Sequence, residues 1–155
     1  MKKTKIIFLA AFICLALLAI TSCSKKTPQT TKGFTDIMEE AGFEVLDITE
    51  MYSDRGPVSS VIIARNENYQ IDFYKLTDNN TAIGVFSNNK QIFDDEHSSK
   101  TFSTSVSSGN YDYYAFNAEG YFHMIARVDD TMLFCEAKEE YKDEILELVK
   151  KLGYK

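Results

Sequence analysis

The amino-acid sequence predicts an α+β fold, with an antiparallel sheet of about six to seven strands built from hairpins and about three helices. Segments that alternate between apolar and polar residues follow one another in pairs, with short turn sequences between the members of each pair. Segments with helical periodicity stand apart, so the order is helix, strand, two strands, helix, four strands, helix. Consecutive strands with segregated helices are typical of α+β proteins.

The first predicted elements are a helix over residues 34–41 and a short strand over 43–48. Phe34, Ile37 and Met38 share one helical face, and Gly42 is a natural helix stop. A loop over 53–57 follows the strand.

A hairpin and a second helix come next. Strands over 58–65 and 69–76 pair across a turn at residues 67–68, and a helix runs from 80 to about 93. Gly84 and two asparagines weaken this helix. Acids at residues 94–96 would lie at the negative end of its dipole, which predicts an early stop.

The last part is predicted as four strands and a helix. Strands over 101–107 and 111–116 pair across Ser108-Gly109, and strands over 121–128 and 131–137 pair across Asp129-Asp130. The helix over 139–152 begins with acids and ends with lysines, and Gly153 follows it. Its apolar stripe consists of Tyr141, Ile145, Leu148, Val149 and Leu152.

An internal similarity links the two predicted ββα segments. Ile62-Ile63-Ala64-Arg65 and Met124-Ile125-Ala126-Arg127 lie 62 residues apart, and each precedes a turn, a strand and a helix. At the same offset Ile71 matches Leu133, and Ile83 matches Ile145. This pattern indicates either a decayed ββα duplication or chance.

Hairpin register sorts the predicted sheet into two faces, because side chains alternate along a strand. A turn at Asp129-Asp130 places a uniformly apolar set on one face, which should meet helices. The other face mixes aromatic, apolar and charged side chains: Tyr114, Phe116, His123, Ile125, Arg127 and Phe134. Rings and arginine are enriched at binding hot spots, so this set is a candidate partner-binding face. The alternative is that a helix covers it.

The first 23 residues combine a basic start, an apolar run and a cysteine. Residues 1–5 hold three lysines, and residues 6–20 are fifteen consecutive apolar residues, fewer than the roughly 20 that span a bilayer. Ile20-Thr21-Ser22-Cys23 then resembles the lipobox of bacterial lipoproteins, with isoleucine in place of the commoner leucine. The resemblance implies cleavage after Ser22 and diacylglycerol on the Cys23 thiol. The alternatives are an ordinary secretory signal and an uncleaved anchor.

The lipobox implies a domain plan and a location. Residues 1–22 are a cleaved signal peptide, residues 23–32 a lipidated cysteine with a flexible tether, and residues 33–155 a single α+β domain. Lipid on Cys23 makes the membrane a partner and places the domain on the extracytoplasmic side of a cell membrane. Cleavage removes three lysines and no acid, leaving 133 residues with a formal charge of −9. That acidity repels phosphate backbones, so we expect no nucleic acid partner.

The sequence lacks recognisable catalytic and cofactor patterns. No GxSxG, HExxH, CxxC, P-loop or GxGxxG pattern occurs. Cys135 and His123 fall on opposite predicted faces, which disfavours a dyad, so Cys135 is interpreted as a small buried hydrophobe. Residues 94–97 are ligand types, but adjacent residues cannot all point inward, and we interpret them as a solvated helix end. We expect no catalytic residue, metal or cofactor.

These observations favour a membrane-anchored extracytoplasmic lipoprotein that acts as a non-catalytic binding or interaction module of the cell envelope. Its partner would be an unidentified envelope protein or a small ligand. An envelope hydrolase of an unrecognised type and an immunity or shielding protein are the alternatives.

Overall fold

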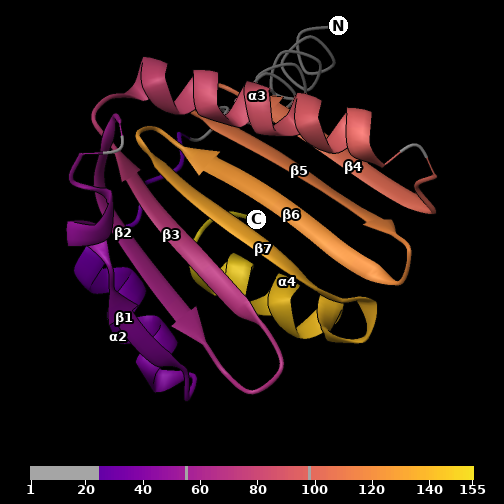
Figure 1. The fold of residues 1–155 in the computed structure, drawn as a ribbon, viewed down its shortest axis with the longest axis horizontal. Helices are drawn as coiled ribbons and strands as arrows, with labels where there is room; N and C mark the ends of the chain where they lie inside the picture. The colour runs from indigo at the N-terminus through magenta and orange to yellow at the C-terminus, as the bar shows by residue number, and fades with distance from the viewer. Residues whose placement is uncertain (1–24, 55, 98) are drawn as a thin grey trace, which may run out of the picture.

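Seven antiparallel strands form one sheet in the order β1-β2-β3-β7-β6-β5-β4 (Figure 1). The computed structural model describes residues 25–54, 56–97 and 99–155. The strands are β1 (Glu44–Asp47), β2 (Val58–Arg65), β3 (Gln70–Leu76), β4 (Phe102–Ser108), β5 (Tyr111–Ala118), β6 (Tyr121–Val128) and β7 (Thr131–Lys138). The helices are α2 (Thr31–Glu40), α3 (Asn79–Glu96) and α4 (Lys142–Lys151), with 3-10 turns at Thr49–Tyr52 and Glu139–Tyr141. The predicted α+β fold is confirmed.

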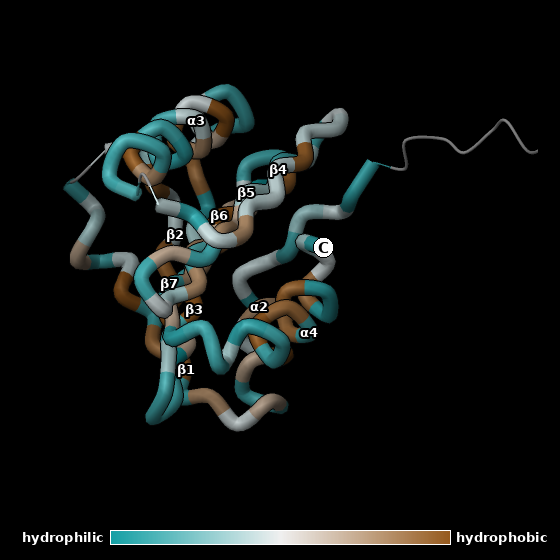
Figure 2. Tube along the Cα trace, turned by 90° about the vertical axis from the view of Figure 1, so that its right-hand side faces the viewer, coloured by the Kyte–Doolittle hydropathy of each residue, from teal (hydrophilic) through white to brown (hydrophobic). Residues whose placement is uncertain are grey.

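Helices lie against both faces of the sheet, so the fold has three layers. α2 and α4 pack on one face and α3 on the other, as the side view in Figure 2 shows. Among the described residues, no helix is long and apolar enough to cross a membrane.

The predicted register of the last hairpin is confirmed. Ala126 lies opposite Leu133 and Ile125 opposite Phe134, with Asp129 at a φ of 48° in the connecting turn. The β4–β5 turn is shifted by one residue from the prediction, because Ser108 pairs with Tyr111 and leaves Gly109 and Asn110 as the turn.

The uniformly apolar face forms the main core with α2 and α4. Phe34 of α2 stacks on Phe73 of β3, with ring centroids 5.1 Å apart. Each large side chain buried here contributes about 1.5–3 kcal/mol relative to exposure. The fully buried members of this core include Phe34, Met38, Ile71, Phe73, Phe122, Met124, Leu133, Ile145 and Val149.

Helix α3 is longer than predicted and does not stop before the acids. Asp78 caps its N-terminus, accepting a hydrogen bond from the Thr81 amide at 2.9 Å. Near its C-terminus the Asp94 carboxylate binds the Lys90 ammonium at 2.5 Å and also the Lys100 ammonium. These cations offset the unfavourable position of Asp94 in the helix dipole, so the helix continues to Glu96.

The tether expected over residues 23–32 is corrected in its described part. α2 already begins at Thr31, and Lys26 is bound to the domain. The Lys26 amide donates to Asn110 Oδ1 at 3.1 Å, and Asn110 Nδ2 donates to the Lys26 carbonyl at 2.7 Å. Lys26 Nζ also donates to the Gly153 carbonyl at 3.1 Å. Such long-range contacts cannot be derived from local composition. Residues 1–24, with the expected signal peptide and Cys23, lie outside the described residues.

The ββα similarity applies to the hairpins but not to the helices. Ile62 and Ala64 of β2 face the main core, as Met124 and Ala126 of β6 do. The following helices lie on opposite faces of the sheet, however. Ile83 is accordingly 40% exposed, whereas its sequence counterpart in α4 is fully buried.

Candidate functional site

The structure brings the six residues of the candidate partner-binding face together, but beneath α3. Five of them are at most 3% exposed, and Phe134 is half-buried. Ala82, Phe86 and Phe93 of α3 pack over them. Of the two alternatives that the sequence left open, an open binding face and a face covered by a helix, the structure has the second. The buried five are Tyr114, Phe116, His123, Ile125 and Arg127.

Arg127 connects the sheet to the start of α3. Its Nε donates to Asp112 Oδ2 at 2.6 Å, and its Nη1 donates to Asn79 Oδ1 at 2.7 Å and to the Asp129 carbonyl at 3.0 Å. The guanidinium is thus paired and hydrogen-bonded, as a buried charge requires. Its role in this structure is to position α3.

The two histidines meet at the other end of α3. The rings of His97 and His123 lie 4.6 Å apart, and His123 stacks on Phe116 at 4.6 Å with an interplanar angle of 6°. Burial lowers the pKa of His123, although Glu136 opposes this shift, with its Oε2 3.4 Å from His123 Nδ1. A neutral, stacked histidine is suited to packing.

Tyr114 is held by charged groups at the same end. Its hydroxyl donates to Asp94 Oδ1 at 2.6 Å, and the Lys90 ammonium lies 4.6 Å from its ring centroid. Hydrogen bonds from Lys100, Lys90 and Tyr114 hold the pKa of Asp94 well below its usual range. This cluster fixes α3 to β5.

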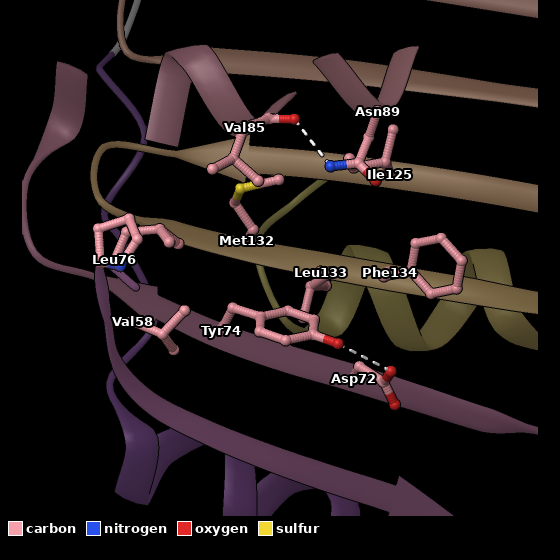
Figure 3. Close-up of a pocket in the computed structure, with 11 residues that line it drawn as sticks. Val58, Asp72, Tyr74, Leu76, Val85, Asn89, Ile125, Met132, Leu133 and Phe134 are labelled. Atoms are coloured by element: carbon pink, nitrogen blue, oxygen red, sulfur yellow. Dashed lines mark hydrogen bonds between the residues drawn. The ribbon is translucent and has the colours of Figure 1, made fainter. Parts of the chain in front are cut away.

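A cavity of about 420 Å³ lies between α3 and the sheet (Figure 3). We call it the sheet pocket. Strands β3, β7 and β6 supply most of its walls, and α3 contributes Val85 and Asn89. Its lining is mostly apolar and consists of Pro57, Val58, Asp72, Tyr74, Leu76, Val85, Asn89, Ile125, Met132, Leu133 and Phe134. Ile125 and Phe134 of the predicted face thus line a pocket.

Asp72 supplies the charged group of the sheet pocket. Its Oδ1 accepts a hydrogen bond from Gln70 Nε2 at 2.6 Å, and its Oδ2 accepts one from the Tyr74 hydroxyl at 3.2 Å. Burial raises the pKa of the Asp72 carboxyl, and these two hydrogen bonds oppose the shift. Figure 3 shows the carboxylate beside the Tyr74 hydroxyl, near the Phe134 ring.

Asn89 supplies a second polar group from the helix side. Its Nδ2 donates to the Val85 carbonyl at 2.8 Å, which orients the amide over the pocket (Figure 3). An apolar cavity with a few placed polar groups is the usual form of a small-molecule site.

The remaining candidate groups are not assembled for chemistry. Cys135 is buried on the main-core side, and burial raises the pKa of its thiol. His123 lies on the α3 side, so the two are separated by the sheet as predicted. Among the described residues, no group of three or more His, Cys, Asp or Glu side chains is placed to hold a metal ion.

Comparison with known proteins adds evidence about the fold alone. No family model matches the chain, and no curated protein matches it. Among solved structures, the chain is similar to a GTP-binding regulator from Thermotoga maritima, with a TM-score of 0.50 and 12% identity. The similarity covers 81% of this chain and 87% of that chain. GTP binding is a property of that protein.

Sequence reasoning missed the part of the site that β3 and α3 contribute. Asp72 lies opposite Phe134 and Tyr74 opposite Met132, because β3 pairs with β7. The alternation of β3 places Asp72 and Tyr74 on one face, and that signal was available. The pairing of β3 with β7 could not be predicted from local patterns, because these strands are far apart in the chain.

Proposed function

We propose that this protein is a lipid-anchored module on the extracytoplasmic side of a cell membrane that binds a small molecule in the sheet pocket. The observation that carries the proposal is the pocket itself, whose volume of about 420 Å³ falls within the range of ligand sites. Its mostly apolar lining supports binding rather than catalysis. Of the two partner classes expected, the small ligand is favoured, because α3 covers most of the candidate protein-binding face.

Lipid on Cys23, which the lipobox resemblance implies, would also fix which end of the domain faces the membrane. Lys26, which is bound to Asn110 at the β4–β5 turn, follows Cys23 by three residues. Three extended residues span at most about 10 Å. An acyl group on Cys23 would therefore hold this end of the domain against the membrane. The Leu76 end of the sheet pocket is near that end, since the Leu76 amide donates to the Asp130 carbonyl at 2.8 Å and Asn110 donates to Asp129 at 2.9 Å.

Ligand binding is tested with 2-phenylethanol, a neutral probe that carries one aromatic ring. The probe is added to the protein in the form that bacterial cells produce after processing, reconstituted in lipid nanodiscs. We expect shifts of the Met132 methyl resonance, after subtraction of probe partitioning into empty nanodiscs. Val85→Trp should abolish them by filling the pocket, whereas Val106→Trp, at a position 43% exposed on β4, should leave them unchanged. Shifts that survive Val85→Trp, or none in the unaltered protein, would refute the pocket as the site.

Anchoring is tested by metabolic labelling with a radioactive fatty acid. Cys23→Ala should lose the label, because its thiol is the proposed acylation site. Cys14→Ala removes a cysteine from the apolar run and should keep the label. Equal labelling of the Cys23→Ala variant and the unaltered protein would refute the anchor while leaving the pocket untouched.

A further inference from the structure

We infer that the sheet pocket selects amines, namely small molecules with an apolar body and a cationic amino group that binds the Asp72 carboxylate. This inference rests on the proposed function and specifies its ligand class. It follows from the position of Asp72, from the ion pairs that the cations of β2 and β3 make with other carboxylates, and from the hydrogen-bonding capacity that the Asp72 oxygens retain.

Asp72 is a half-buried carboxylate that has no cationic partner within the part of the chain that the structure describes. None of the ion pairs among the described residues includes it. The cations of β2 and β3 pair with other carboxylates: Arg65 pairs with Glu44 at 2.8 Å, and Lys75 pairs with Asp130 at 2.9 Å. Removing a carboxylate from water without a nearby cation costs desolvation free energy. A cationic ligand at Asp72 would offset this cost.

Apolar side chains surround this carboxylate across the sheet. On β7 its direct neighbour is Phe134, and on β2 it is Ile63. Burial by such neighbours raises the pKa of Asp72, which is the signature of a charge that water stabilises poorly. An ammonium group bound there would be poorly hydrated in turn, and charge-assisted hydrogen bonds are strongest under these conditions.

The carboxylate retains hydrogen-bonding capacity for a ligand. An ionised carboxylate offers about four acceptor sites. Gln70 and Tyr74 occupy one each, on different oxygens, and these bonds orient the group in the pocket wall. The remaining sites accept bonds from donors only, so an ammonium group fits and a ligand carboxylate is repelled.

The rest of the pocket fits the apolar body. Leu76, Ile125, Met132 and Phe134 present aliphatic, thioether and aromatic surface within a cavity of about 420 Å³. Figure 3 shows the Tyr74 side chain beside Asp72 and the Phe134 ring on the neighbouring strand β7. An aromatic or branched aliphatic amine would bury its body against these side chains while its nitrogen reaches the carboxylate.

Three probes of similar size and different charge test this inference: 2-phenylethylamine, 2-phenylethanol and 3-phenylpropionate. Each is titrated into the protein in nanodiscs at neutral pH, with empty nanodiscs as the blank, and the Met132 methyl shift is followed. The amine should bind about fivefold to tenfold more tightly than the alcohol, as expected for one partly buried charge pair. The propionate should bind more weakly than either.

Asp72→Asn keeps the shape of the side chain and should remove the preference for the amine. Glu67→Gln removes the same charge from the exposed β2–β3 turn and should keep it. Equal affinities for the amine and the alcohol in the unaltered protein would overturn the amine specificity while leaving the pocket as a general apolar site. Failure of all three probes would instead refute the proposed function. The probe series in the unaltered protein decides the inference even where Asp72→Asn does not fold.

Discussion

Replacement of Arg127 by methionine tests whether this residue acts inside the protein rather than at a surface. The guanidinium is 2% exposed and its partner Asp112 is 14% exposed. Removing one member of a buried ion pair costs about 3–5 kcal/mol, because the other charge is left without compensation. Asp112 keeps some water and a hydrogen bond from the Ser107 hydroxyl at 2.5 Å. We therefore expect Arg127→Met to lower the free energy of unfolding by about 3 kcal/mol.

The assay is urea unfolding followed by tyrosine fluorescence, since the chain has no tryptophan. Arg65→Met is the matched control, because Arg65 occupies the equivalent position of the β2–β3 hairpin and pairs with Glu44 in solvent, where both side chains are at least half exposed. An exposed pair contributes at most about 1 kcal/mol. The double variant Arg127→Met, Asp112→Leu should recover most of the loss, since an apolar pair replaces a buried ionic one at little cost. A loss below about 1 kcal/mol for Arg127→Met, or equal losses in both arginine variants, would refute a buried structural role.

Three further outcomes follow from buried side chains. The Cys135 thiol should react with Ellman's reagent only after denaturant unfolds the protein, and rapid reaction of the folded protein would contradict its burial under α2 and α4. Because burial lowers the pKa of His123, the unfolded chain binds its proton more readily, so the stability that this residue contributes is complete above about pH 6.5 and falls as the pH drops towards its folded pKa. His123→Phe should flatten that part of the stability profile measured by urea unfolding, and an unchanged slope would exclude this residue as the cause. Tyr154 is fully buried, with its hydroxyl 2.5 Å from Thr131 Oγ1, so Tyr154→Ala should cost about 3–5 kcal/mol in a thermal or urea melt, whereas Tyr121→Ala, at a position 44% exposed, should cost under about 1 kcal/mol.

Local chemistry accounts for the parts of the fold that sequence reasoning predicted. β2 and β6 have the predicted bounds, because alternation and turn residues act within a few positions of one another. The register across Asp129-Asp130 follows from the turn, and it placed His123 opposite Glu136 as expected. The predicted end of α3 was wrong, because it depends on a residue outside the helix. Lys100 helps to neutralise Asp94, and α3 continues to Glu96.

The sequence predicted which side chains of β5, β6 and β7 share a face, but of that predicted set only Ile125 and Phe134 line the sheet pocket. Tyr114, Ile125 and Phe134 do share one face, since that follows from period-2 alternation. Whether a helix covers the face depends on where α3 packs after leaving β3, and local periodicity does not contain that information. The long segment from Asp78 to His97 crosses the sheet above β6 and β7, which buries Tyr114 and leaves the pocket between Val85 and Asp72.

The sequence by itself determined the class of fold, the alternation of each strand and the apolar face, because these depend on residue types a few positions apart. It also contains Ile20-Thr21-Ser22-Cys23, a short linear pattern that resembles a lipobox. Only the tertiary structure decided that β3 pairs with β7, that Lys26 binds Asn110, and that Asp72, which has no ion pair among the described residues, lines a pocket. These are contacts between segments up to 84 residues apart, and their free energy depends on burial and geometry that exist only once the sheet is assembled.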